Sequence, residues 1–220
     1  MPNIFIIVPA FNEEKNIIAT LNDLLPLGHN IVVVDDGSND QTLAMIKKMP
    51  VIALSHKINR GQGAALATGT AYALKQNADF IIHFDADGQF LAHELTTFIQ
   101  PLLNNSCDIV LGSRFKNKNH VPWFKKNLIH PVAKIVDYLF TGLKLTDAHC
   151  GLRAMNRLAA EKIVITQDGM SHNTEIVAQI KKNNLRFLEL PATVIYKEFG
   201  QGIGGGIKIV RDLIINKIIN

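Results

Sequence analysis

The segment Ile4-Phe5-Ile6-Ile7-Val8-Pro9-Ala10-Phe11-Asn12-Glu13 joins an unbroken apolar run to a polar turn. Four of its first five residues are β-branched, and such a run is typical of a strand that is covered on both faces in a parallel sheet. The segment therefore predicts a buried strand whose carboxyl end opens into a polar loop.

Four more runs of the same kind occupy the first half of the chain, at Ile31–Val34, Val51–Leu54, Phe80–Ile82 and Asp108–Leu111. Helical stretches alternate with these runs, at Glu13–Leu25, Asp40–Met49, Gly61–Asn77 and Leu91–Asn104. A helix over Ser171–Lys182 and a strand over Phe187–Val194 come later. This alternation predicts an α/β fold, a Rossmann-like open and mostly parallel sheet with helices on both faces.

Length and composition are those of one packed domain: 220 residues, 47% hydrophobic and 19% charged. The net charge of +4 lies entirely in residues 181–220, where seven basic residues outnumber three acidic ones. Two cysteines fit a reducing compartment, and no stretch reaches the ~18–20 uncharged apolar residues that cross a bilayer. The basic residues do not alternate with aromatic residues in a recognisable motif, so nucleic acid is not expected as a partner.

Two carboxylates follow the fourth predicted strand, in Asp85-Ala86-Asp87-Gly88-Gln89. Residues two apart in an extended segment point the same way, so the two carboxylates converge and repel each other unless a cation lies between them. Oxygen ligands favour Mg²⁺ or Mn²⁺, and such ions commonly hold substrate phosphates. The alternative is a turn in which the aspartates cap the next helix.

The ends of the second and third predicted strands carry weaker signals. Asp36, after a buried strand, can accept from a base N–H or a ribose hydroxyl, although Asp36–Asp40 can equally be a turn and an N-cap. Arg60-Gly61-Gln62-Gly63 can bring backbone N–H groups to a phosphate at a helix start. It lacks the Gly-Lys-Ser/Thr ending of a P-loop.

The chain changes character after Arg114. Residues 109–136 contain no Asp or Glu, whereas lysines recur there, and apolar residues from Trp123 to Phe140 have helical spacing. This pattern predicts a cationic loop leading into an amphipathic helix.

Six motifs follow one another along the chain: Pro9-Ala10-Phe11-Asn12-Glu13, Val34-Asp35-Asp36-Gly37-Ser38, Asn59-Arg60-Gly61, Asp85-Ala86-Asp87-Gly88-Gln89, Gly112-Ser113-Arg114 and Thr146-Asp147-Ala148-His149-Cys150-Gly151-Leu152-Arg153. Their order and approximate spacing are those of family 2 glycosyltransferases, and the chain resembles that family over residues 3–195. The dolichyl-phosphate mannosyltransferase and polyprenyl-phosphate glycosyltransferase branch of the family is the most similar.

The resemblance implies a GT-A fold and inverting transfer from a nucleotide-diphosphate sugar. It implies one catalytic domain over residues 1–220, with a nucleotide-sugar part (1–115), an acceptor part (116–195) and a glycine-rich segment with a last helix (196–220). Asp85 and Asp87 would hold the metal and diphosphate, with Gln89 completing the metal ligands. The residues implied in the donor site are Pro9, Ala10, Phe11, Glu13, Asp36 (on the base), Gly61, Asp85, Ala86 and Asp87.

The acceptor side differs from that of the processive polysaccharide synthases, whose Q-x-x-R-W motif is absent. A lipid phosphate is already an anionic nucleophile at neutral pH, since the second pKa of a phosphate monoester is about 6. Such an acceptor needs cations to position it rather than a strong base to deprotonate it. We therefore expect Arg114 and Arg153 to bind phosphate, and Asp147 to be a base or an acceptor-orienting residue. The alternative for Asp147 is an N-cap or an ion pair with Arg153.

The expected partners are a UDP- or GDP-sugar donor and a polyprenyl-phosphate acceptor. The last predicted helix, Ile207–Ile219, is expected to lie on the membrane surface or to dock on a membrane partner subunit. This predicts a cytoplasmic enzyme, peripheral on the cytoplasmic face of the membrane. Alternatives are transfer to a hydroxyl of a glycan or protein in cell-envelope polysaccharide synthesis, a nucleotidyltransferase, and a catalytically silent scaffold. Lys197 and Lys208 are the stand-ins for a family element that reaches the acceptor phosphate.

Overall fold

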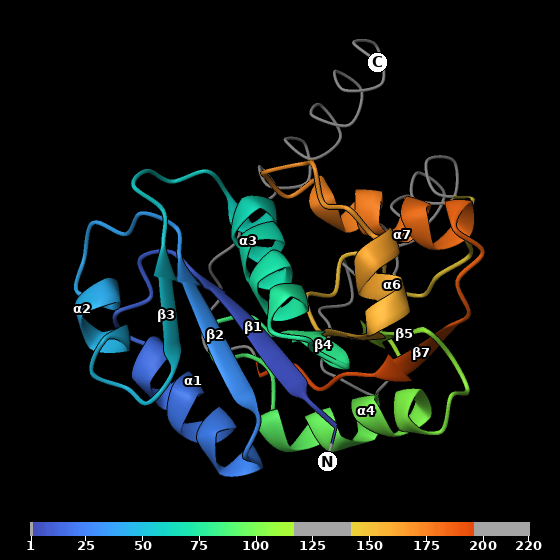
Figure 1. Cartoon of the computed structure of the whole chain (residues 1–220), viewed down its shortest axis with the longest axis horizontal. Coiled ribbons are helices and arrows are strands. Elements are labelled where there is room, and N and C mark those ends of the chain that lie inside the picture. Colours follow the sequence, from blue (N-terminus) through green and yellow to red (C-terminus); the bar gives the residue numbers. More distant parts are fainter. Residues whose placement is uncertain (1, 117–141, 196–220) are drawn as a thin grey trace, which may run out of the picture.

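A seven-stranded sheet organises the part of the chain that the computed structural model describes, residues 2–116 and 142–195 (Figure 1). The strand order is β3-β2-β1-β4-β6-β5-β7. All neighbouring pairs are parallel except those of β6, which is antiparallel to both β4 and β5. The strands are β1 (Ile4–Ala10), β2 (Asn30–Asp35), β3 (Ile52–Ser55), β4 (Phe80–His83), β5 (Ile109–Ser113), β6 (Arg153–Asn156) and β7 (Phe187–Pro191).

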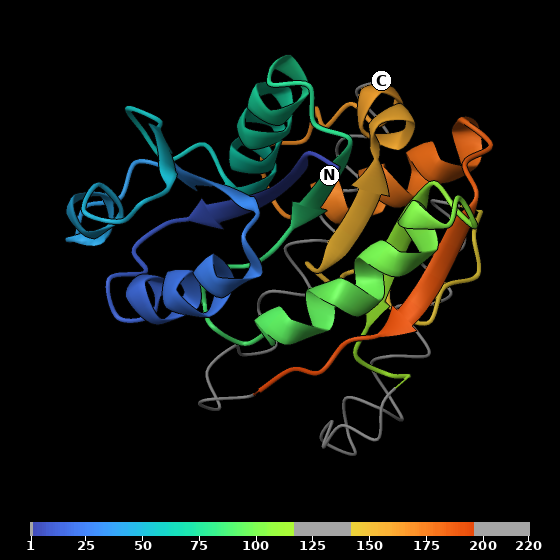
Figure 2. The ribbon, with the colours of Figure 1, turned by 60° about the horizontal axis from the view of Figure 1, so that its bottom comes forward.

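Helices cover both faces of this sheet, as Figures 1 and 2 show. Alternate residues of β1 face opposite sides. Ile6 and Val8 pack in one apolar cluster with residues of α1, α2 and α4, and Ile7 packs in the other with residues of α3, α6 and α7. The helices are α1 (Ile17–Leu24), α2 (Thr42–Ile46), α3 (Gln62–Lys75), α4 (Leu95–Leu103), α6 (Arg157–Lys162) and α7 (His172–Lys182), with 3₁₀ turns η1 (Leu25–Leu27) and η2 (Ala92–Glu94). The predicted α/β fold with an open, mostly parallel sheet is confirmed.

The predicted helices that fall within residues 2–116 and 142–195 are present but shorter at their ends, because polar groups form turns there. The carbonyl of Glu13 accepts from the amides of Asn16 and Ile17, so α1 begins only at Ile17. Asp40 Oδ1 accepts from the amide of Thr42 at 2.9 Å and marks the start of α2. The predicted last strand, Phe187–Val194, ends at Pro191.

Strand β6 was not predicted, although it lies inside the sheet between β4 and β5. It is four residues long and begins and ends with polar residues, Arg153 and Asn156, so it carries no apolar run. The Asn156 side chain then accepts from the amide of Ala159 at 2.9 Å and caps α6. Neighbouring strands and a helix cap therefore define this element.

Several predicted features lie outside the described residues. They are the amphipathic helix after Trp123, most of the cationic loop, Lys197, Lys208 and the last helix at Ile207–Ile219. Across residues 2–116 and 142–195, no helix combines the length and apolar character needed to span a bilayer.

The contact between α3 and β1 generates a stability prediction. A Cβ on Gly69 of α3 would lie 2.2 Å from Cγ2 of the fully buried Ile7. We expect Gly69→Ala to lower the free energy of unfolding by about 1–3 kcal/mol, as overpacking a core does. Gly169→Ala is the control, because a Cβ there meets nothing within 4 Å. Urea unfolding of both variants checks this, and equal midpoints would contradict it.

Candidate active site

Polar residues gather at the edge of the sheet where β1, β2, β3, β4, β5 and β7 end. Because β6 runs the opposite way, it begins at this edge, and its first residue, Arg153, lies between His83 of β4 and Leu111 of β5. Ligands of open α/β sheets bind outside the carboxyl ends of the strands. The topology therefore places the predicted site residues of both halves of the chain along one rim.

The Asp85–Asp87 loop follows β4 and is fixed from two sides. The carbonyl of Ala86 accepts from Thr20 Oγ1 of α1 at 2.9 Å, and Asp85 Oδ1 accepts from Gln62 Nε2 of α3 at 2.7 Å. Gly151 lies against the carboxylate, since a Cβ on Gly151 would be 2.1 Å from Asp85 Oδ2. The glycine of the Asp147–Arg153 motif is therefore the residue that leaves room for Asp85.

The electrostatics of this loop favour a bound cation. Burial, followed by the charge of Asp87, raises the pKa of Asp85 to about 6, and the positive charges of Arg153 and Arg114 only partly oppose this rise. Burial also raises the pKa of Glu13, with a further contribution from Asp87. Mg²⁺ is typically held by one or two carboxylates together with substrate phosphates. The pair Asp85 and Asp87 fits that kind of site, and among the described residues no group of three or more His, Cys, Asp or Glu forms a complete metal cage.

Gln89 contributes backbone groups to the same loop. Its amide donates to Asp87 Oδ1 at 2.9 Å, and its carbonyl accepts from the amide of Ile195 at 2.9 Å. These contacts hold Asp87 in place, and a metal-binding role of the Gln89 side chain stays a prediction.

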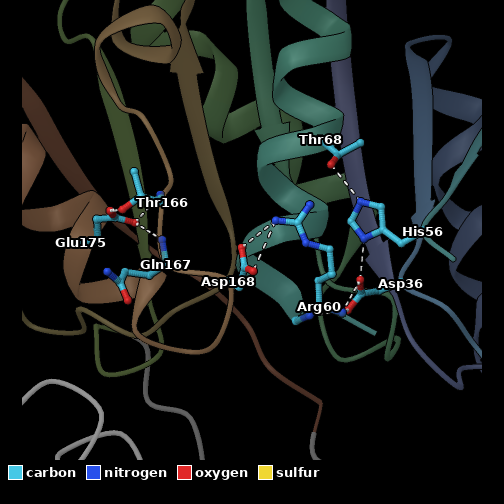
Figure 3. Close-up of polar contacts among 9 residues, drawn as sticks. Asp36, His56, Arg60, Thr68, Thr166, Gln167, Asp168 and Glu175 are labelled. Carbon is cyan, nitrogen blue, oxygen red and sulfur yellow. Dashed lines mark hydrogen bonds and ion pairs between the residues drawn. The ribbon is translucent and has the colours of Figure 1, made fainter. Parts of the chain in front are cut away.

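Asp36 holds the loop that precedes α3. Its carboxylate accepts from the amide of Gly61 at 2.6 Å and from the amide of Arg60 at 3.1 Å, and Asp36 Oδ1 lies 2.6 Å from His56 Nδ1 (Figure 3). His56 Nε2 lies 2.9 Å from Thr68 Oγ1 of α3. Asp36 is 2% exposed, and its carboxylate contacts the 56–61 loop in this structure. Its predicted contact with the base of a nucleotide stays a prediction.

The start of α3 is occupied by protein groups. The amide of Gly61 donates to Asp36, and the amide of Ala64 donates to the carbonyl of Asp168 at 3.3 Å. Glu175 of α7 accepts from the amides of Thr166 and Gln167 and so orders the loop that carries Asp168 (Figure 3). The amides of Arg60 and Gly61 are therefore paired with Asp36 in this structure, and a phosphate contact at this helix start stays a prediction.

The remaining donor-site residues have different exposures. Pro9 and Ala10 are buried as the last residues of β1, Phe11 is 40% exposed directly after them, and Glu13 is half-buried. Phe11 and Glu13 therefore lie at the rim directly after β1, while Pro9 and Ala10 are buried beneath them at the end of the strand.

Arg114 and Asp147 form a two-point ion pair. Arg114 Nε donates to Asp147 Oδ2 at 2.7 Å and Nη2 donates to Oδ1 at 2.8 Å, while the Arg114 amide also donates to Oδ2 at 3.0 Å. Burial alone would raise the pKa of Asp147, but the hydrogen bonds and charge of Arg114 outweigh it, and the pKa lies below its usual value. The expected alternative partner, Arg153, is not the residue that binds Asp147.

Arg153 is enclosed at 1% exposure. Its Nη2 donates to Asn173 Oδ1 of α7 at 2.5 Å and to the carbonyl of Ala148 at 3.5 Å, while Nη1 has no hydrogen-bond partner among the described residues. The guanidinium lies behind the rim, where its charge acts on Asp85 and Asp147. A direct phosphate contact by Arg153 stays a prediction.

Comparison with known proteins identifies the family of this chain. The model of the family "Glycosyl transferase family 2" matches residues 5–164. The chain belongs to glycosyl transferase family 2.

Relatives of this glycosyl transferase cover nearly the whole chain. An uncharacterized protein of Methanocaldococcus jannaschii is 40% identical over 98% of this chain and 92% of its own length. The UDP-N-acetylglucosamine–dolichyl-phosphate N-acetylglucosaminyltransferase of Methanococcus voltae is 34% identical, over 94% and 91%. The polyprenol monophosphomannose synthase of Mycolicibacterium smegmatis is 26% identical, over 89% and 78%.

Solved structures share the GT-A fold with this glycosyl transferase. Glucosyl-3-phosphoglycerate synthase from Mycobacterium tuberculosis, in complex with Mg²⁺ and UDP, superposes with a TM-score of 0.74 over 97% of this chain and 77% of its own. The two sequences are only 16% identical, so this likeness concerns the fold. The GT-A fold that the motifs implied is confirmed.

The sequence analysis did not predict the side-chain contacts of four residues at the candidate site. Gln62 contacts Asp85, His56 contacts Asp36, Asn173 contacts Arg153, and Glu189 binds the loop that carries Asp147. Gln62 directly follows the Asn59-Arg60-Gly61 motif and His56 lies three residues before it, so their position in the sequence could have indicated a role at the site. Asn173 and Glu189 lie within a helix and a strand and carry no local signal.

Two other buried side chains near the rim are uncharged at neutral pH. Burial, followed by the charge of Arg153, lowers the pKa of His172 to about 4 and keeps this ring neutral. Burial, followed by the charge of Asp147, raises the pKa of Cys150 to about 12, so this thiol is not ionised at neutral pH.

The raised pKa of Asp85 generates a prediction for metal-free protein. Because the folded-state pKa of about 6 exceeds the ordinary value of 3.8, ionisation of Asp85 disfavours folding as the pH rises through this interval. We expect Asp85→Asn to raise the melting temperature at pH 8 in EDTA and to leave it unchanged at pH 4.

Glu161→Gln is the control, because Glu161 is half-exposed in a surface pair with Arg157. The same change in melting temperature at both pH values for Asp85→Asn would contradict the assigned pKa.

Proposed function

We propose that this family 2 glycosyl transferase moves a sugar, with inversion, from a nucleotide-diphosphate sugar to a polyprenyl phosphate. Three relatives support this proposal by their names. Two are the dolichyl-phosphate N-acetylglucosaminyltransferase and the polyprenol monophosphomannose synthase described above, and the third is the undecaprenyl-phosphate 4-deoxy-4-formamido-L-arabinose transferase of Aeromonas hydrophila. The ion pair between Arg114 and Asp147 carries the proposal.

The pairing of Asp147 favours an acceptor that needs no deprotonation. Both oxygens of Asp147 accept hydrogen bonds from Arg114, and its pKa is below its usual value, which makes it a weak base. A sugar or protein hydroxyl needs a base to attack, whereas a phosphate monoester carries its negative charge at neutral pH. Asp147 is thus proposed to orient Arg114, and Arg114 is proposed to bind the phosphate.

We place the donor diphosphate at the Asp85–Asp87 loop, together with Mg²⁺ or Mn²⁺. Asp85 and Asp87 would hold the ion, whose positive charge stabilises the departing diphosphate when it is bound. The residues proposed to contact the nucleoside and sugar are Pro9, Ala10, Phe11, Glu13, Asp36, Gly61 and Ala86. Solved neighbours were crystallised with UDP and Mn²⁺ or Mg²⁺, and we propose a UDP- or GDP-sugar as the donor, with uracil or guanine as its base.

The proposed acceptor lies in a membrane, so we propose a peripheral enzyme on the cytoplasmic face. The last predicted helix and the positive charge of residues 181–220 support this location.

The contact of Gly151 with Asp85 generates a prediction about the metal site. A Cβ on Gly151 would overlap the Asp85 carboxylate, so we expect Gly151→Ala to displace it and to weaken Mn²⁺-dependent nucleotide binding by about tenfold or more, the range seen when a metal site loses its support. Isothermal titration with Mn²⁺ and UDP or GDP measures this.

Gly169→Ala, where the added Cβ meets open space, controls for the substitution itself. Nucleotide affinity of Gly151→Ala equal to that of the control would contradict the proposed metal site.

A pair of acceptors of equal chain length tests the proposed reaction. The enzyme is incubated with Mg²⁺ or Mn²⁺, a panel of labelled UDP- and GDP-sugars, and either a polyprenyl phosphate or the corresponding polyprenol. We expect labelled lipid only from the phosphate. Transfer to the alcohol, or to a glycan hydroxyl instead, would overturn the proposal.

Arg114→Gln tests the proposed phosphate contact. We expect sugar transfer to fall about 10- to 100-fold, because hydrogen bonds to charged groups contribute roughly 1.5–3 kcal/mol. Arg157→Gln is the matched control, since Arg157 is half-exposed and pairs with Glu161 on α6. Thermal melting confirms that each variant is folded, and unchanged transfer by folded Arg114→Gln would contradict the assignment.

A further inference from the structure

Glu189 is a buried carboxylate on β7 that the motifs do not include. Strand β7 runs parallel to β5, with Glu189 opposite Leu111, and the Glu189 side chain is 8% exposed. Its Oε1 accepts from the amide of Thr146 at 2.8 Å, from Thr146 Oγ1 at 2.9 Å and from the amide of Asp147 at 3.3 Å. Three donors from one loop therefore converge on one oxygen.

These contacts continue to the backbone beside Arg114. Thr146 uses its single hydroxyl proton toward Glu189, because a carboxylate only accepts. Ser113 Oγ, 2.6 Å from Thr146 Oγ1, must then donate to Thr146, and Ser113 Oγ itself accepts from the amide of Phe115 at 3.3 Å. A directed chain of hydrogen bonds thus runs from Phe115 through Ser113 and Thr146 to Glu189.

Glu189 is connected to two cations of the proposed acceptor side, to Arg114 through Asp147 and to Lys116 through its backbone carbonyl and a longer ion pair. It fixes the amide of Asp147, whose side chain holds Arg114 at two points. Lys116 Nζ donates to the carbonyl of Glu189 at 2.8 Å and lies 3.9 Å from Glu189 Oε2. Arg114 and Lys116 are therefore both tied to β7 through Glu189.

We propose that Glu189 is a positioning residue, which holds Arg114 and Lys116 at a fixed spacing to bind the phosphate of the acceptor. This inference rests on the proposed function for the identity of the acceptor, and on the hydrogen bonds of Glu189 for the positioning.

The cost of the arrangement argues for such a role. A buried charge is expensive unless it is paired and hydrogen-bonded, and an apolar residue at this position of β7 would avoid that cost. Glu189 instead gathers three donors, a lysine and, through Asp147, an arginine. Two cations at fixed spacing match the two or more oxygens of a phosphate monoester.

Variants of Glu189 test the proposal. Gln at this position keeps an oxygen for the three donors of residues 146–147 but loses the charge near Lys116, whereas Ala loses both. We expect Glu189→Ala to raise the KM for polyprenyl phosphate about 10- to 100-fold, with the Kd for the sugar nucleotide unchanged, and Glu189→Gln to restore most of the loss. Glu94→Ala is the matched control, because Glu94 is a half-buried carboxylate that accepts from the amide of Thr193 at 3.0 Å.

A second pair of variants covers the case in which Glu189→Ala does not fold. Thr146→Val removes the hydroxyl from the chain of hydrogen bonds at nearly constant shape, and Thr146→Ser keeps it. We expect Thr146→Val, but not Thr146→Ser, to raise the KM for the acceptor. Unchanged acceptor KM in both Thr146→Val and folded Glu189→Ala would overturn the proposal.

Hydrogen exchange separates this inference from the proposed function. We expect the amides of residues 142–150 to exchange faster in Glu189→Ala than in wild type or Glu94→Ala, in the absence of any substrate. Faster exchange together with no transfer to polyprenyl phosphate by the wild type would refute the proposed acceptor and retain the positioning role. Unchanged exchange would refute the positioning role whatever the acceptor.

Discussion

The buried guanidinium of Arg153 is the charge around which the rim is organised. It lies at the start of the antiparallel strand β6, and the charges of Asp85 and Asp147 favour it there although burial lowers the pKa of Arg153. Burial, followed by the charge of Arg153, lowers the pKa of the neighbouring His83 to about 3 and that of His172 to about 4. Burial and this one cation together keep the two imidazoles neutral, and the charge of Arg153 partly opposes the rise in the pKa of Asp85. The antiparallel direction of β6 is what puts Arg153 directly behind the rim.

The two aspartates respond to this environment in opposite ways, and the difference divides the site. The pKa of Asp85 rises because burial and Asp87 outweigh the arginines, whereas the pKa of Asp147 falls because Arg114 binds it directly. Neighbouring titratable groups whose environments move their pKa values apart take different roles. At the Asp85 side, burial and the negative charge of Asp87 outweigh the charges of the two arginines, and a cation bound with a diphosphate would relieve this repulsion. At the Asp147 side, the carboxylate is paired with Arg114 and is a weak base, so under the proposed function it orients Arg114 toward an acceptor that needs no deprotonation.

The sequence predicted the parts of this site that follow apolar strands, and it missed the parts that depend on tertiary contacts. Asp85, Asp87 and Arg114 could be placed because each comes directly after an apolar run. The short strand β6 was missed because only its neighbours β4 and β5 make it a strand. The partners of Asp36 and Asp147 could not be chosen, since His56 lies 20 residues from Asp36, and Arg114 lies 33 residues from Asp147. Distances of that kind are set by the order of the strands.

The contacts around α3 show how the two halves of the chain are held together at the site. The ion pair between Arg60 and Asp168 spans 3.3 Å, but both side chains are about half exposed, and such pairs contribute roughly 0–1 kcal/mol. The close packing of Gly61 and Gly63 against the loop before α7 constrains the backbone more strongly. A Cβ on Gly61 would lie 2.3 Å from the carbonyl oxygen of Asp168, and a Cβ on Gly63 would lie 2.0 Å from the carbonyl oxygen of Gln167. Since Asp36 binds the amide of Gly61, the loop that carries Asp168 packs directly against the backbone that Asp36 holds, and the second half of the chain thereby borders the proposed nucleoside site.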